Sequence, residues 1–186
     1  MADKAQALTL SQADLDTLRT LSNPFFAAAC DSIFQRSTRL AEKLKEQNLV
    51  QPTPDVPAEK VFDAIVAPHL GKVVVVDLWN TWCGPCKAAL KANEPLKEGE
   101  LADDDIVWVY IADESSPLPN YLSIIPDIKG LHYRLSGEQK KAINSRFEVD
   151  GIPYYIIVDR KGNATGRPDL RDHNLYIKTI KEKLSE

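Results

Sequence analysis

Three apolar runs in the sequence predict the central strands of a sheet. Residues 72–79, 106–112 and 154–158 are rich in β-branched and aromatic residues and do not alternate with polar ones, which is typical of strands buried on both faces. The segment 86–96 between the first two runs has helical composition, and Pro95 can kink or end that helix. A strand, a helix and a second strand in this order predict a right-handed crossover and a parallel pair.

The C-terminal half predicts further elements around these strands. A turn at residues 159–163 follows the third strand, so 164–167 is expected to pair antiparallel with it at an edge of the sheet. Residues 172–184 predict an amphipathic helix whose apolar positions are Leu175, Ile177, Ile180 and Leu184. Shorter elements are a helix at 58–67, a loop with a short helix at 115–125, a strand at 130–135 and a helix at 138–147. The fold class is therefore α/β, with a mixed sheet covered by helices.

The N-terminal quarter has a different pattern. Residues 11–48 predict two helices separated near Ser22, Asn23 and Pro24. The second helix carries one apolar stripe, which packs against the rest of the fold or docks a partner; it is formed by Phe26, Cys30, Ile33, Leu40 and Leu44. We expect a helical extension at 1–50, a proline-rich connector at 51–57 and the main domain at 58–186.

Length and composition narrow the class of protein. The chain has 186 residues, 44% of them hydrophobic and 27% charged, which fits one globular domain with an appendage. No apolar run approaches the roughly 18 to 20 residues of a membrane helix. A net charge of −4 offers no basic field for a phosphate backbone, so nucleic acid is a poor candidate partner. The first residues, 1–8, show no signal-peptide pattern, which fits either a cytosolic protein or a chain from which an export signal or anchor was removed.

The candidate chemistry lies in Cys83-Gly84-Pro85-Cys86, directly after the first buried strand. A cysteine at the start of a helix faces unpaired backbone N–H groups and the positive end of the helix dipole, both of which favour the thiolate. Cys83 is therefore the expected nucleophile. Cys86, one turn further along, is the expected resolving thiol, and Pro85 favours the early helical turn.

This arrangement predicts thiol–disulfide exchange. The Cys83 thiolate attacks a substrate disulfide, and Cys86 then displaces the reduced substrate from the mixed disulfide. The exchange needs no cofactor within the chain. It does need an external thiol or dithiol electron donor to restore the reduced cysteine pair, and its substrates are disulfide-containing proteins.

The residues around the cysteines resemble the thioredoxin superfamily. Residues 76–87 are similar to its active-site segment, including an aspartate and two tryptophans, and residues 149–154 are similar to its second signature, the loop with a cis proline. The resemblance covers residues 58–186 and implies the thioredoxin-like fold, with the two segments adjacent in space. Two features are similar to the TlpA-like thiol–disulfide oxidoreductases of the bacterial envelope: the long helical segment between the second strand and the proline loop, and an extra element before the strand that begins at Lys72. This resemblance implies a periplasmic or envelope-associated location, with the cytoplasm as the alternative.

The resemblance also implies roles for supporting residues. Asp77 matches the buried carboxylate under the active site and is expected to have a raised pKa and to exchange a proton with Cys86. Pro153 matches the cis proline, and Ile152 is expected to offer its backbone to a substrate strand. Trp82 is expected to shield the cysteines or simply to pack against them.

Four other readings remain open. A disulfide oxidase or isomerase would use the same cysteines, whereas the Gly-Pro pair resembles reducing thioredoxins, whose potentials lie at about −270 mV. A peroxidase of the same superfamily would need its reactive cysteine in a Pro-x-x-x-Thr-x-x-Cys motif, which does not occur around Cys83. A metal carrier would use two thiolates and a histidine, but His69, His132 and His173 show no paired spacing, so no metal site is expected. A docking protein that keeps the fold without redox activity would not need the intact cysteine pair.

Cys30 is expected to be a core residue of the second N-terminal helix.

Overall fold

The computed structural model describes residues 50–186 without a gap, and before them only 16, 17, 20, 28, 29, 31, 32, 35 and 38, all in helical conformation. The chain forms two compact units, Met1–Asn48 and Leu49–Glu186. The two predicted N-terminal helices, their apolar stripe and Cys30 lie largely outside the described residues, so the extension at 1–50 and the domain boundaries stay predictions.

A five-stranded mixed sheet forms the centre of this unit, in the order β3-β2-β1-β4-β5. Strand β1 pairs in parallel with β2, and β2 with β3, while β4 is antiparallel to both β1 and β5. The strands are β1 (Val73–Leu78), β2 (Ile106–Asp113), β3 (Leu131–Leu135), β4 (Tyr154–Val158) and β5 (Ala164–Arg167). The parallel pair and the antiparallel edge strand are thus confirmed.

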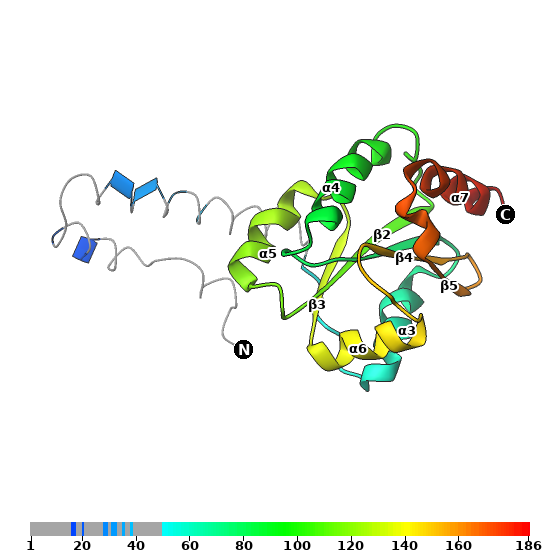
Figure 1. Ribbon diagram of the computed structural model, residues 1–186, viewed down its shortest axis with the longest axis horizontal. Coiled ribbons are helices and arrows are strands. Elements are labelled where there is room, and N and C mark those ends of the chain that lie inside the picture. Colours follow the sequence, from blue (N-terminus) through cyan, green and yellow to red (C-terminus); the bar gives the residue numbers. More distant parts are fainter. Residues whose placement is uncertain are drawn as a thin grey trace. The chain divides into compact units, whose positions relative to one another are not determined.

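Helices cover both faces of the sheet (Figure 1). Helices α4 (Gly84–Asn93), α5 (Leu118–Ile124) and α7 (His173–Ser185) lie over one face, and α3 (Val61–Val66) and α6 (Gly137–Arg146) lie over the other. Short 3₁₀ turns flank them: η2 (Ala58–Lys60), η3 (Ala67–His69), η4 (Glu94–Lys97), η5 (Ile125–Asp127) and η6 (Pro168–Arg171). Pro95 falls in η4, directly after α4, so it ends the α-helix as the sequence indicated. The fold is the expected thioredoxin-like arrangement.

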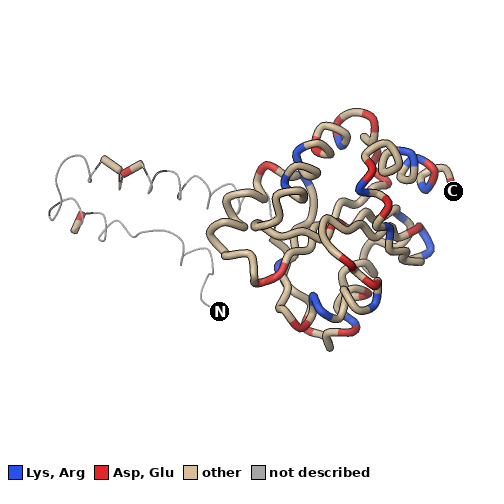
Figure 2. Tube along the Cα trace, in the orientation of Figure 1, with Lys and Arg blue, Asp and Glu red and all other residues tan. Residues whose placement is uncertain are grey.

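The two faces of β1 differ in chemistry. Successive side chains point to opposite faces of a strand, so Val74, Val76 and Leu78 share one face and Val73, Val75 and Asp77 share the other. The Val74 face belongs to an apolar core with α3 and α6. Acidic and basic residues otherwise gather on the helices and turns, and the central strands are almost free of them (Figure 2). The carboxylate of Asp77, inside β1, is therefore unusual among the residues of the central strands.

The predicted amphipathic C-terminal helix is present as α7. Of its four predicted apolar positions, Ile180 is buried, and Leu175, Ile177 and Leu184 are half-buried. Tyr176 and Thr179 are buried as well, and the Tyr176 ring packs on the Tyr155 ring of β4, with centroids 4.9 Å apart.

Candidate active site

The two cysteines lie where β1 gives way to α4. The Cys83 amide donates to the Asn80 carbonyl at 3.0 Å, which turns the chain after the strand. Cys83 then caps α4 through its side chain, because the Cys86 amide donates to Cys83 Sγ at 3.1 Å. A disulfide joins Cys83 and Cys86, whose Cα atoms are 5.3 Å apart. The predicted pairing and the position of Cys83 at the helix start are both present.

The cysteines differ in access to solvent. Cys83 is 5% exposed and Cys86 is fully buried. Gly84 and Pro85, which separate them, are exposed at the first turn of the helix. Only the Cys83 sulfur is therefore placed to meet a partner that approaches from outside.

Trp82 stands beside this surface and is 61% exposed. Its Nε1 donates to the Ser115 hydroxyl at 2.9 Å, which fixes the ring against the loop after β2. The same loop is hydrogen-bonded to the turn at Asn80 and Thr81 that precedes the cysteines. The Thr81 amide donates to Ser116 Oγ, and Ser116 Oγ donates to Asn80 Oδ1. Neither serine could be predicted from the sequence, because a hydroxyl in a loop has no characteristic spacing.

The proline loop lies next to the cysteines. The Ile152–Pro153 peptide bond is cis, as the resemblance implied. Every other peptide bond among the described residues is trans. The Ile152 carbonyl oxygen is 3.7 Å from Cys83 Sγ. Pro153 is buried and Ile152 is half-buried. Two segments about 70 positions apart in sequence thus meet at one sulfur atom.

Asp77 is buried on the face of β1 that looks toward α4 and α7. Burial raises the pKa of its carboxyl to about 7, and the positive charges of Lys140 and Lys97 offset only part of that rise. Its Oδ1 atom has no hydrogen-bond partner in the described part of the chain. Tyr110 and Tyr155 are its direct neighbours on the adjoining strands. A carboxyl group in such a place can take up or release a proton near neutral pH.

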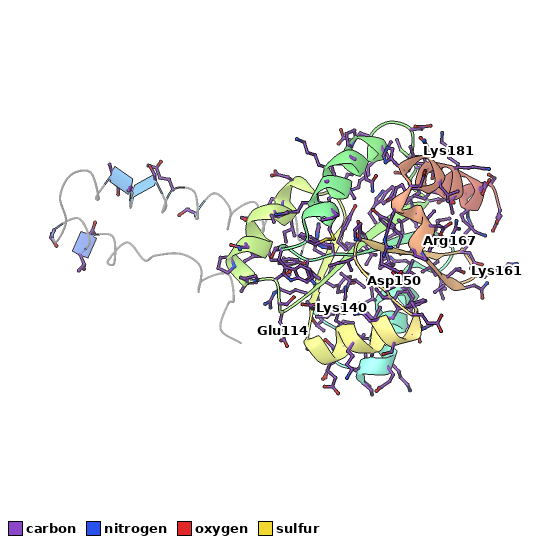
Figure 3. All side chains as sticks on the ribbon, viewed as in Figure 1. Glu114, Lys140, Asp150, Lys161, Arg167 and Lys181 are labelled. Carbon is purple, nitrogen blue, oxygen red and sulfur yellow. A yellow bond between two sulfur atoms is a disulfide. The ribbon has the colours of Figure 1, made fainter. Side chains whose placement is uncertain are left out.

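Two buried lysines accompany Asp77, and the sequence analysis missed both. Lys140 lies on the side of α6 that turns toward the sheet (Figure 3), and its Nζ donates to the Ile111 carbonyl of β2 at 3.2 Å. Burial lowers the pKa of Lys140 to about 8. Lys97 in η4 donates to the Lys129 carbonyl at 2.7 Å and lies 4.8 Å from the centre of the Tyr110 ring.

The sequence could not distinguish these lysines from surface ones. A lysine in a polar helix is ordinarily solvated, and neither position interrupts an apolar pattern. Lys97 is paired with the Glu94 carboxylate, and the burial of both ammonium groups arises only when η4 and α6 dock on the sheet.

A largely apolar groove of about 440 Å³ runs beside the active site. Pro85 and Pro153 form its end nearest the cysteines, and Tyr155, Leu170 and His173 line it further along. On the opposite wall stand small side chains of α4, those of Ala88, Ala89 and Ala92. The groove could hold a segment of another chain while a sulfur atom of that chain is near Cys83.

The described residues contain no group of three or more histidine, cysteine, aspartate or glutamate side chains arranged to hold a metal ion. Within the same residues, no helix has both the length and the apolar character that crossing a membrane requires.

Comparison with known proteins agrees with this geometry. The thioredoxin-like family profile matches residues 71–164, which contain the cysteine pair and the proline loop. A thioredoxin-like protein of Bacillus subtilis, YneN, is 30% identical over 92 residues, which are 50% of this chain and 53% of that protein. A thioredoxin of Malassezia sympodialis is 36% identical over 53 residues, 28% of this chain and 50% of that protein. The chain thus spans about half the length of these relatives.

A solved structure shows the same fold. A thiol:disulfide interchange protein of the thioredoxin family from Chlorobium tepidum superposes with a TM-score of 0.52 at 23% identity, covering 64% of this chain and 84% of the other. The thioredoxin domain of a thiol-disulfide oxidoreductase from Bacteroides vulgatus gives a TM-score of 0.55 at 19% identity, covering 63% and 84%.

Proposed function

Because the chain belongs to the thioredoxin-like family, we propose that it is a thiol–disulfide oxidoreductase that reduces protein disulfides through Cys83 and Cys86. The observation that carries the proposal is the Cys83 sulfur at the start of α4, where it accepts a hydrogen bond from the Cys86 amide at 3.1 Å and is bonded to Cys86 itself. The same amide and the helix dipole stabilise the thiolate when the pair is reduced.

The first step forms a mixed disulfide. The Cys83 thiolate attacks one sulfur of the substrate disulfide, a new S–S bond forms, and the substrate S–S bond breaks. The second substrate sulfur leaves as a thiolate and takes a proton from water. Cys83 is the attacking atom because Cys86 is fully buried.

The second step releases the substrate. Cys86 loses its proton, attacks Cys83 Sγ and forms the Cys83–Cys86 disulfide as the mixed disulfide breaks. The substrate sulfur leaves as a thiolate and takes a proton from water, and the cysteine pair has been oxidised by two electrons. We assign Asp77 as the group that takes the Cys86 proton, because its pKa of about 7 lets the carboxyl be charged or neutral near neutral pH. Lys140 and Lys97 keep the anion accessible by lowering that pKa from the level burial alone would set.

The proline loop and the groove bind the substrate in this proposal. An extended substrate segment pairs with the Ile152 backbone next to Cys83. Its flanking side chains reach the apolar groove between Pro85 and Pro153. We propose that Trp82, held by Ser115 and adjacent to Cys83 in the chain, shields the sulfur from water and from unrelated thiols.

We propose that the net direction is reduction. The Gly84-Pro85 pair is the one found in reducing members of the resembled family, and an external thiol or dithiol donor would restore the reduced pair. Equilibration against glutathione buffers tests this: we expect a midpoint near −270 mV, and a value above about −180 mV would instead indicate an oxidase or isomerase. We further propose an envelope location, on the resemblance to TlpA-like proteins, which fractionation of cells that produce the chain would test.

Substitution of each cysteine tests the function. Cys83→Ser should lower insulin reduction with dithiothreitol to the uncatalysed rate, since no other sulfur is at the helix start. Cys86→Ser should trap a mixed disulfide between Cys83 and the substrate, visible as an added mass that a reductant removes. Cys30→Ser, the remaining cysteine of the chain, is the control and should keep the wild-type rate. Full activity of the Cys83→Ser variant would contradict the proposal.

A further inference from the structure

One guanidinium group is bonded to the proline loop at three points. Arg171 Nε donates to the Pro153 carbonyl at 2.9 Å, and Arg171 Nη2 donates to the Gly151 carbonyl at 2.9 Å and to the Asp150 carboxylate at 2.8 Å. Asp150, labelled in Figure 3, lies in the segment that leads from α6 to β4. Nothing in the sequence links Arg171 with this loop, which lies about 20 positions earlier.

The bonded carbonyls are the two that flank Ile152. Arg171 binds the carbonyls of Gly151 and Pro153, and the Ile152 carbonyl between them lies 3.7 Å from the Cys83 sulfur. The guanidinium fork therefore fixes the backbone on which the attacking sulfur and a substrate strand would meet.

The backbone of Arg171 is itself held in place. Leu170, the preceding residue, is buried, and the following residue, Asp172, caps α7 by accepting a hydrogen bond from the Leu175 amide at 2.9 Å. Arg171 is also one wall of the apolar groove beside Pro85 and Pro153. The side chain thus links the N-terminus of α7 to the active-site loop.

We propose that Arg171 is a positioning residue for substrate: it holds the Gly151–Pro153 backbone in the orientation that lets Ile152 pair with an extended disulfide-containing segment next to Cys83. This inference rests on the proposed function, because it assumes that protein disulfides react at Cys83. Arg171 acts through the loop and takes no part in the proton or sulfur chemistry.

The test separates protein substrates from small ones. Insulin, with dithiothreitol as donor, needs the loop to align a segment, whereas 5,5′-dithiobis(2-nitrobenzoate) reaches Cys83 without backbone pairing. For Arg171→Ala we expect the KM for insulin to rise about tenfold, equivalent to about 1.4 kcal/mol, with kcat within about twofold of wild type. The rate with the small disulfide and the pH profile of Cys83 alkylation should stay unchanged.

Two further variants sharpen the result. Arg167→Ala is the matched control, because this neighbouring arginine (Figure 3) bonds to Asp169 and Thr179 and makes no bond to the loop among those described. It should behave as wild type in every assay. Arg171→Lys keeps the charge but cannot bridge two carbonyls with a planar fork, so we expect an intermediate rise in KM of about threefold. This variant decides the question if Arg171→Ala does not fold.

Three results would overturn the inference in distinguishable ways. Equal KM values for the Arg171 variants and the Arg167→Ala control would show that substrate binding does not depend on the hydrogen bonds from Arg171 to the proline loop. An equal loss with insulin and with the small disulfide would show that Arg171 supports the thiol or the fold rather than substrate alignment. Failure of the wild-type protein to reduce insulin would contradict the proposed function, and the inference would fall with it.

Discussion

The two faces of β1 are both rich in valine, but their side chains lie in chemically different surroundings. Toward α3 and α6, Val74, Val76 and Leu78 belong to an apolar core with the aromatic pair Phe62 and Phe147, whose ring centroids are 4.7 Å apart. The buried ammonium group of Lys140 on α6 also lies toward this face, where it donates to the Ile111 carbonyl. Toward α4 and α7, the strand presents Asp77, and around it lie buried tyrosines of β2, β4 and α7 and the ammonium group of Lys97.

The two faces of β1 contribute to the free energy of folding with opposite signs. The α3–α6 face gains free energy by removing apolar surface from water. The α4–α7 face buries a carboxylate whose pKa rises because the charged form is poorly solvated, which is unfavourable for stability above that pKa. That cost falls on the face of β1 toward α4, the helix that begins after Cys83, and we propose that proton transfer near neutral pH uses this carboxyl group.

The largest expected effect is on the apolar face. Phe62→Ala should lower the free energy of unfolding by about 3 to 5 kcal/mol, because it deletes a buried ring that packs on Phe147. Urea denaturation measures the loss. The pH profile of insulin reduction by the folded variant should match that of wild type, and a shifted profile would show that the two faces are not separate.

On the polar face, Asp77→Asn should stabilise the protein, and the gain should depend on pH. The folded-state pKa of Asp77, about 7, lies above its ordinary value of 3.8. The stability that the neutral carboxyl contributes is fully present below about pH 4 and is lost as pH rises to 7. The variant avoids this loss, so its advantage in urea denaturation should grow from near zero at pH 4 to roughly 2 to 4 kcal/mol above pH 7.

The same variant should slow the second chemical step. Without a carboxyl group to accept the Cys86 proton, release of reduced insulin at pH 7 should fall by about 10- to 100-fold. Lys140→Met is the complementary change: it removes a positive charge that lowers the pKa of Asp77, so the midpoint of the pH–rate profile should move upward. A flat pH dependence of stability in wild type, or an unchanged release rate in Asp77→Asn, would contradict the role of this carboxyl.

The smallest effect concerns the end of α6. Glu148 follows this helix with a positive φ of 51°, a conformation that favours glycine, and the Val149 amide donates back to the Asn144 carbonyl at 2.9 Å. Glu148→Gly should raise the free energy of unfolding by about 0.5 to 1 kcal/mol. Thermal denaturation would show this, with Glu138→Gly in the first turn of α6 as a control of opposite sign.

Local patterns predicted most of the fold because each carried its own signal. Uninterrupted β-branched runs marked β1, β2 and β4, and a turn between two strands marked β5 as the antiparallel edge. The contact of Tyr176 on α7 with Tyr155 could not be predicted in this way, because it depends on where β4 lies. At the candidate site, Cys83 and Cys86 were predicted from their spacing after a buried strand, and Asp77 and Pro153 from two short segments that resemble one family.

The sequence by itself determined which sulfur begins a helix, because the helix-start position of Cys83 follows from local spacing and turn chemistry. Only the tertiary structure decided what surrounds that sulfur. The burial of Lys140 and Lys97 near Asp77, the hold of Ser115 on Trp82, and the three bonds from Arg171 to the proline loop join elements that are far apart in the chain. Such contacts leave no periodic trace, because a hydrogen bond or a desolvated charge depends on distances that exist only once the sheet and its helices have packed.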